Sequence, residues 1–232
     1  MTVTIQIKYF IFFSAVNSYI FLSVQHKSVK GYKILERYLK PTTAINHNSP
    51  SIIEQAKLLT APVDSLQRKA VQLFYFVRDQ IKYTPYAEYG NFDIYTASYT
   101  LKQKSGFCIP KAVLLTALAR ACSIPARLGF AIIHNYLLSG DLFKLLGTTR
   151  IVYHGYCELF IDENWIKATP AFDLEMCEKH SFIPVDFDGS SDAVFHPTNK
   201  AGKPHIEYEK IIGVYEDLPF EDIVQTFLKI YG

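Results

Sequence analysis

The chain has 232 residues, of which 49% are hydrophobic and 20% are charged, a balance typical of a folded globular protein and not of a disordered one. This length is enough for one well-buried domain, with or without an appendage. The net charge of +2 and the lack of a dense Lys/Arg patch in the sequence give no reason to expect nucleic acid as a partner.

The N-terminal part of the sequence is apolar. Residues 9–24 form an apolar run interrupted only by Asn17 and three serines. This run is shorter than the about 20 residues that a membrane-spanning helix needs, and no small-x-small cleavage site follows it. The pattern predicts that residues 1–29 are an appendage and that residues 30–232 form the main domain. We expect a cytoplasmic protein; export or membrane anchoring through residues 9–24 is the alternative, and membrane association has no other basis in the sequence.

Helical patterns fill the first half of the main domain. Residues 30–39 predict a short helix that ends before Pro41, and Pro50 predicts the start of a second. A third helix begins after Asp64 or Ser65, either of which is a good N-cap. Its apolar residues recur at three- and four-residue spacing as far as Ile81 and form one stripe.

A segment rich in aromatic residues leads to the next helix. Residues 83–99 contain Pro85 and Gly90 and predict a loop, whose tyrosines and phenylalanines either border a substrate groove or pack on the domain. The helix that starts near Cys108 continues to about Ala121, where the sequence Ser123-Ile-Pro-Ala ends it.

The period of the pattern then changes from helical to extended. Residues 127–133 and 151–161 are rich in β-branched and aromatic residues and predict strands, with a turn at residues 162–164 before a short strand at 165–167. Residues 181–205 predict a loop, and residues 222–231 predict a closing helix. Helices followed by an antiparallel sheet indicate an α+β domain in which the helical part packs on the sheet.

Cys108 is the residue most indicative of function. A glycine-containing turn, Ser105-Gly-Phe, places this cysteine in the first turn of an apolar helix, where free N–H groups and the helix dipole favour a thiolate. His154 follows on a predicted strand. This order, a cysteine on a helix and then a histidine on a sheet, is typical of thiol enzymes in which the histidine is the base.

Several motifs together resemble the transglutaminase-like superfamily. They are Ser105-Gly-Phe-Cys, the helix end Ala-Leu-Ala-Arg-Ala-Cys-Ser-Ile-Pro-Ala-Arg127, and Tyr153-His-Gly-Tyr-Cys-Glu followed by Trp165. The resemblance covers residues 66–173, which we expect to form the catalytic core. It implies a papain-like α+β fold with a Cys-His-acid site, and members that include transglutaminases, peptide hydrolases, peptide N-glycanases and inactive domains.

The third catalytic position departs from the pattern of this superfamily. The superfamily usually has Asp-Pro-Thr after the tryptophan, whereas this sequence has Ala168-Thr-Pro, so that Thr169 stands in the place of the aspartate. Asp173, four residues further on, is the predicted orienting carboxylate, and Thr169 is the alternative, since a hydroxyl also accepts the ring N–H. Glu158 is about 13 Å along the strand from His154 and is too far away.

The other cysteines and histidines have simpler interpretations. Cys122, Cys157 and Cys177 are expected to be small buried residues. The four cysteines contain no Cys-x-x-Cys motif, and no pair of histidines has metal-ligand spacing. We therefore expect reduced thiols, with no metal and no cofactor.

These features predict a cysteine hydrolase, a peptidase or amidase, that acts through Cys108 and His154 on a peptide, protein or small amide. In this hypothesis the backbone N–H of Cys108 is one oxyanion donor. Two alternatives remain: an inactive transglutaminase-like binding module, which the missing Asp-Pro-Thr favours, and a protein-glutamine acyl transferase, in which an amine replaces water.

Overall fold

The computed structural model describes residues 35–138 and 140–231. The chain divides into two units, Met1–Arg37 and Tyr38–Gly232, and the second contains the main domain. The predicted appendage at residues 1–29, including the apolar run, lies outside the described residues. Residues 30–34 of the first predicted helix do as well; the described part of that segment holds a short 3-10 helix, η1, at Glu36–Leu39.

The helices of the first half begin where the sequence predicts. Helix α2 spans Pro50–Thr60 and has proline in its first turn after the N-cap Ser49. Helix α3 spans Leu66–Gln80, and its N-cap Ser65 accepts a hydrogen bond from the backbone N–H of Arg68. Both starts are therefore confirmed, with Ser65 and not Asp64 as the cap.

The predicted loop at residues 83–99 is wrong in its second half. A 3-10 helix, η2, occupies Phe92–Tyr95, and helix α4 spans Ala97–Gln103. Asn91 caps η2 by accepting the N–H of Asp93. The aromatic residues that resemble a loop pattern are here the buried face of helical turns, since Tyr95 and Ala97 are fully buried.

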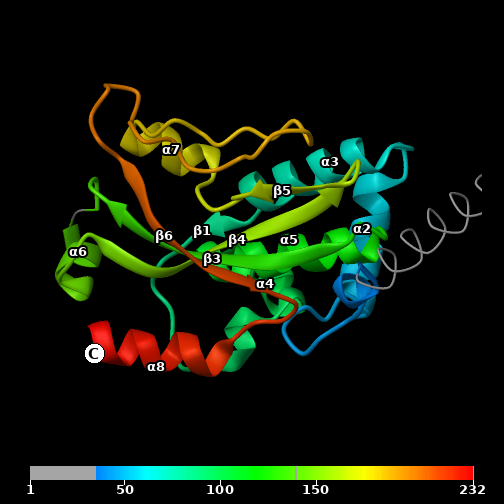
Figure 1. The fold of residues 1–232 in the computed structure, drawn as a ribbon, viewed down its shortest axis with the longest axis horizontal. Helices are drawn as coiled ribbons and strands as arrows, with labels where there is room; N and C mark the ends of the chain where they lie inside the picture. Colours follow the sequence, from blue (N-terminus) through cyan, green and yellow to red (C-terminus); the bar gives the residue numbers. More distant parts are fainter. Residues whose placement is uncertain (1–34, 139, 232) are drawn as a thin grey trace, which may run out of the picture. The chain divides into compact units, whose positions relative to one another are not determined.

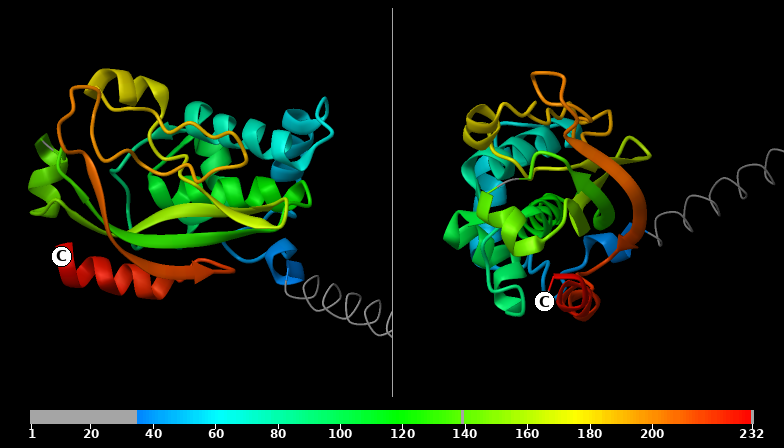
Figure 2. Two further views of the ribbon diagram at one scale, coloured as in Figure 1. Left: turned by 45° about the horizontal axis from the view of Figure 1, so that its top comes forward. Right: turned by 90° about the vertical axis from the view of Figure 1, so that its left-hand side faces the viewer.

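The main sheet is antiparallel and has four strands in the order β5-β4-β3-β6. Its strands are β3 at Ala126–Asn135, β4 at Arg150–Ile161, β5 at Asn164–Ala168 and β6 at Ile206–Tyr215. The first three confirm the predicted strands. Strand β6 is not apparent from the sequence; it pairs with β3 from Leu128↔Tyr215 to Asn135↔Ile206. Figure 2 shows this sheet curving around the central helix α5.

Helix α5 spans Cys108–Ala121, as predicted, and is buried along its whole length, with every residue from Cys108 to Arg120 buried. It packs on β4 and β3 and contacts α2, α3 and α4 on its other sides. A two-stranded parallel sheet, β1 (Lys82–Tyr83) with β2 (Ser105–Gly106), leads into its start. Helix α5 therefore lies between the other N-terminal helices and the sheet (Figure 1).

Three further helices complete the described part of the chain. They are α6 at Gly140–Leu146, α7 at Leu174–His180 and α8 at Phe220–Tyr231. Helix α8 confirms the predicted closing helix, whereas α6 and α7 are not apparent from the sequence. The segment from residue 181 to residue 205 holds only isolated bridges, which confirms the predicted loop.

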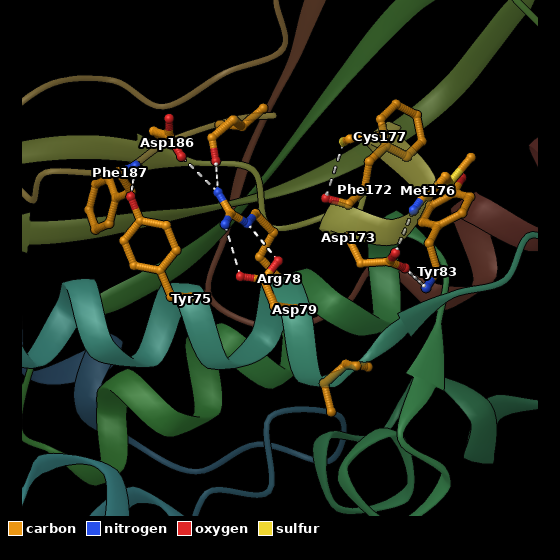
Figure 3. Close-up of polar contacts among 12 residues, drawn as sticks. Tyr75, Arg78, Asp79, Tyr83, Phe172, Asp173, Met176, Cys177, Asp186 and Phe187 are labelled. Atoms are coloured by element: carbon orange, nitrogen blue, oxygen red, sulfur yellow. Dashed lines mark hydrogen bonds and ion pairs between the residues drawn. The ribbon is translucent and has the colours of Figure 1, made fainter. Parts of the chain in front are cut away.

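Buried cations hold the loops to the helices. The guanidinium of Arg78 donates to the carbonyl of Val185 at 2.8 Å and pairs with Asp79 and Asp186 (Figure 3). The guanidinium of Arg120 donates to the carbonyls of residues 40, 126 and 216. These charge-assisted bonds satisfy main-chain carbonyls that leave regular structure inside the domain.

The described part of the chain is an α+β domain whose helical N-terminal part packs on a curled antiparallel sheet, the fold class predicted from the sequence. Among residues 35–138 and 140–231, no helix is long and apolar enough to cross a membrane.

His205 makes the domain sensitive to acid. Its ring is 1% exposed, stacks on Phe182 with 4.1 Å between centroids, and has no hydrogen-bond partner among the described residues. Burial lowers its pKa from 6.5 to about 4. Between these values the unfolded chain binds a proton that the folded chain does not, so the free energy of unfolding falls as the pH drops through this window.

We therefore expect His205→Leu to flatten the acid side of the stability profile between pH 6.5 and pH 4, by at most about 1.4 kcal/mol per pH unit for one proton. Urea unfolding at a series of pH values measures this slope. Unfolding at neutral pH, where the imidazole is uncharged in both states, reports the effect of the substitution on packing alone. An unchanged acid slope would contradict the assignment to His205.

Candidate active site

Cys108 is the first residue of α5 and lies in a ring of main-chain N–H groups. Phe107, the N-cap, supplies no side-chain cap, so the first amides of the helix remain directed toward the start of the helix. The backbone N–H groups of Gly155, Ile109 and Cys108 itself stabilise negative charge on the sulfur. The cysteine is only 9% exposed, so the sulfur lies inside the domain and not on its surface.

His154 reaches the same place from the sheet because β4 contains an irregularity. The register of β3 and β4 passes from Ala131↔His154 to Ile133↔Ile151, so β4 has one extra residue there, and Tyr153 has a left-handed backbone with φ of 54°. Such a bulge redirects the following side chain. The imidazole is 1% exposed and lies against the ring of Phe195, with 4.9 Å between centroids.

Burial shifts the pKa values of both groups in the directions that favour their neutral forms. It raises the pKa of the Cys108 thiol from 9.0 to about 11, although the three N–H groups act in the opposite direction. It also lowers the pKa of His154 from 6.5 to about 3. The resting thiolate stays a prediction, which the loss of hydration at this buried position opposes and the N–H groups at the helix start favour.

Asp173 lies at the N-terminus of α7 as its N-cap and borders the same cavity as His154. Its two carboxylate oxygens accept the backbone N–H groups of Met176 at 2.9 Å and of Tyr83 at 2.7 Å (Figure 3). The carboxylate thus caps α7 and fixes β1. An aspartate directly before a short apolar helix is a recognisable N-cap signal. Its role as the orienting acid of His154 stays a prediction, and these contacts give it a different task.

Thr169 lies one residue beyond the paired part of β5. The ladder with β4 ends at Ala168, and the backbone N–H of Thr169 donates to the carbonyl of Ala193 at 2.9 Å. The hydroxyl of Thr169 lies near the phenol of Tyr208, whose pKa it lowers against the larger effect of burial. This hydroxyl and Nε2 of His154 are both buried and make no hydrogen bond of regular geometry among the described residues. Thr169 as the alternative third position therefore stays a prediction.

Two cavities meet at Cys108. The first has a volume of about 430 Å³ and contains His154, Asp173 and charged side chains of both signs, among them Lys82 and Glu175. The second has a volume of about 300 Å³ and is bordered mainly by apolar and aromatic side chains of α6, β4 and α8. Cys108 and Tyr83 border both cavities, whereas His154 borders only the first.

The aromatic residues before the cysteine both border the cavities and pack on the domain, the two roles expected from the sequence. Tyr83 and Tyr86 border the charged cavity, and Tyr83 and Tyr89 border the apolar one. Phe92 and Tyr95 instead pack against Phe220 of α8. The sequence thus indicates a groove here, but it does not distinguish the tyrosines of the groove from those of the core.

Two residues that support the site were missed. Gly155 lets β4 approach α5, because a Cβ at this position would lie 3.0 Å from the Cα of Ile109. Lys111 is fully buried, and its ammonium donates to the carbonyls of Arg78 and Ile81 at the end of α3. A glycine next to the candidate histidine, in Tyr153-His-Gly, could have indicated a close backbone contact. A lysine in an apolar helix, by contrast, does not reveal from the sequence which groups it will bind.

The remaining motif residues have structural roles. Arg127 pairs with Glu158 at 2.6 Å and stacks on the ring of Trp165 at 3.9 Å. All four cysteines are free thiols; Cys157 and Cys177 are buried as expected, whereas Cys122, at the solvent-near end of α5, is only half-buried. In the part of the chain that the structure describes, no three His, Cys, Asp or Glu side chains gather as potential metal ligands.

One comparison with known proteins shows the family. The sequence model of the transglutaminase-like superfamily matches residues 53–170. No curated protein matches the sequence. Among solved structures, a protein from Cytophaga hutchinsonii named as a candidate cysteine protease is 17% identical, with a TM-score of 0.45, over 77% of this chain and 53% of that one.

The periplasmic domain of TgpA from Pseudomonas aeruginosa is 19% identical, with a TM-score of 0.41, over 60% of this chain and 46% of that one. A candidate protease from Parabacteroides distasonis is 15% identical, with a TM-score of 0.40, over 59% of this chain and 25% of that one. This chain thus spans about half or less of the length of these structures.

The neutral state of the site predicts an alkaline reactivity profile. We expect the rate of Cys108 alkylation by iodoacetamide to rise with a midpoint near pH 11 and not below the ordinary value of 9.0, because only the thiolate reacts. Mass spectrometry of the modified peptide at a series of pH values measures this profile. A midpoint well below 9.0 would show that a thiolate–imidazolium pair forms at rest.

The contacts of Asp173 predict a loss of stability in Asp173→Asn. An asparagine retains one acceptor, so one of the two N–H groups loses its partner, and we expect a cost of about 1–2 kcal/mol in the free energy of unfolding. Urea unfolding measures this change, and Cys108 alkylation measures the site. A slower alkylation with unchanged stability would instead identify Asp173 as the partner of His154, and Thr169→Val is the matched comparison.

Proposed function

The chain belongs to the transglutaminase-like superfamily, and we propose that it is a cysteine hydrolase acting on amides, with Cys108 as nucleophile and His154 as base. The single observation that supports this proposal most strongly is that a helix-start cysteine and a strand histidine border one cavity, with Gly155, the neighbour of His154, directing its N–H to the sulfur. A thiol and an imidazole in one cleft are the minimum for thiol catalysis.

In the proposed reaction the thiol is activated only when a substrate is bound. His154 takes the proton of Cys108 as the sulfur attacks the amide carbonyl, so the S–C bond forms and the carbonyl oxygen gains the negative charge. The backbone N–H of Cys108 is the proposed oxyanion donor. His154 then gives its proton to the amine, the C–N bond breaks and a thioester remains on Cys108.

Water completes the proposed cycle. It loses a proton to His154 as its oxygen attacks the thioester, the C–S bond breaks, and the proton returns to the sulfur of Cys108. In the acyl transferase alternative, a second amine takes the place of water. The charged cavity beside His154 is open to polar groups and thus accommodates either acceptor. The proposed partner is accordingly a peptide, protein or small amide, and the site residues are Cys108, His154 and, in the third position, Thr169 or Asp173.

An inactive binding module is the second candidate. Burial favours the neutral thiol at rest, and both oxygens of Asp173 are occupied by main-chain N–H groups. Loss of the third group lowers the rate of related enzymes without abolishing it. The same observations are therefore compatible with the cysteine hydrolase, and the experiment below distinguishes it from the binding module.

A burst experiment with p-nitrophenyl acetate tests the proposal. We expect one equivalent of p-nitrophenolate to be released as Cys108 is acylated, followed by slower turnover. Cys108→Ala should abolish the burst, and His154→Ala should slow it by about a hundredfold, within the usual range for removal of a general base. Cys122→Ala is the matched control, because this thiol lies at the other end of α5.

A burst that persists in Cys108→Ala would contradict the proposal. If the wild-type protein shows no burst, and no acyl adduct of Cys108 appears by mass spectrometry, the binding-module interpretation replaces it.

A further inference from the structure

The apolar cavity beside Cys108 has a chemical character that the mechanism above does not use. Its border includes Phe107, Ile151 and Val152 at its inner end, Leu145 of α6, and Phe227 and Leu228 of α8. A volume of about 300 Å³ is at the lower end of the range for small-molecule sites. It has room for one aliphatic or aromatic group and not for a folded partner.

Two of the tyrosine hydroxyls at the border of this cavity already make hydrogen bonds. The hydroxyl of Tyr89 donates to the carbonyl of Pro85. The hydroxyl of Tyr231 donates to the carbonyl of Arg150 at 3.1 Å and accepts the N–H of Val152 at 2.9 Å. These tyrosines therefore present mainly ring carbons to the cavity, and a polar group placed there would lose its hydration without gaining a partner.

The position of His154 fixes which part of a substrate enters which cavity. The leaving amine must take its proton from the imidazole, and His154 borders the charged cavity only. The amine side of the amide is therefore in the charged cavity. The acyl group stays bonded to the sulfur of Cys108, and the other cavity that Cys108 borders is the apolar one.

We propose that the apolar cavity is the acyl-group subsite, and that the substrate is an amide with an aliphatic or aromatic acyl group and a polar or charged amine part. This inference rests on the proposed function for the direction of the amide. The 55% and 61% exposure of Leu145 and Leu228, unfavourable in itself, is then accounted for, because the two side chains form the mouth of the cavity and contact the acyl chain as it enters.

Two pairs of reagents test this inference separately from the amide chemistry. Alkylation of Cys108 by N-hexyliodoacetamide and by iodoacetamide needs no carbonyl attack and reports only the cavity. Acylation by p-nitrophenyl hexanoate and by p-nitrophenyl acetate reports the cavity and the chemistry together. In wild type we expect the longer reagent of each pair to react about tenfold faster or more, because burial of each methylene group is favourable.

Leu228→Asp and Leu145→Asp place a carboxylate at the mouth of the cavity, and we expect each to reduce both ratios to about one. Leu58→Asp is the matched control: Leu58 lies on α2, is 72% exposed and borders neither cavity, so both ratios should stay at the wild-type value. Circular dichroism establishes that the variants are folded. Octanoate, added to wild type, should slow the longer reagents and leave the shorter ones unaffected, and this measurement needs no substitution.

Ratios near one in wild type, or ratios that survive both Asp substitutions, would overturn the acyl subsite. A preference for N-hexyliodoacetamide that both substitutions remove, without any ester burst, would support an apolar site at Cys108 and overturn the amide chemistry. Equal bursts from the two esters would have the opposite meaning: the chemistry would stand and the subsite would fall.

Discussion

The contact between the backbone of β4 and the first turn of α5 is the constraint on which the site depends. Gly155 has no side chain, and any Cβ there would come within 3.0 Å of the Cα and 3.2 Å of a side-chain carbon of Ile109. Only this close approach puts the N–H of Gly155 at the sulfur of Cys108. Because His154 directly precedes Gly155, the same contact brings the histidine to the cavity of the cysteine. The fold therefore positions the pair through main-chain packing and not through a side-chain hydrogen bond.

Burial then sets the chemistry of the pair. A helix start by itself favours a thiolate, but by an amount that falls off within one turn and diminishes in partly hydrated positions. At Cys108 the loss of hydration is larger, and the same loss acts on His154 in the opposite direction. Both pKa shifts favour the neutral pair, in which the sulfur carries its proton and the imidazole is uncharged. In the proposed reaction the substrate therefore completes the activation, since charge separation becomes favourable only when the carbonyl takes up the negative charge.

Local signals made much of the fold predictable from the sequence. The start of α5 at Cys108, the Ser65 cap of α3, and strands β3 and β4 follow from periodicity and capping, which act within a few residues. Strand β6 was not predicted, because its place in the sheet comes from pairing with β3, some 80 residues earlier in the chain. The role of Asp173 depends in the same way on Tyr83, which lies 90 positions away. The burial that shifts the pKa of Cys108 is also a property of the whole domain, so no local motif reports it.

Two residues are candidates for the third catalytic position, and different arguments support each of them. Alignment on the proline selects Thr169, and charge selects Asp173 as the better electrostatic partner. In the structure the carboxylate of Asp173 accepts two main-chain N–H groups, and the hydroxyl of Thr169 lies near the phenol of Tyr208. Nε2 of His154 is buried and has no hydrogen-bond partner among the described residues, and a buried polar atom without a partner carries a desolvation cost of about 1–3 kcal/mol. An orienting group, whichever residue supplies it, would recover that cost and fix the tautomer of the imidazole. The carboxylate of Asp173 meanwhile holds the backbone of Tyr83, a residue that borders both cavities.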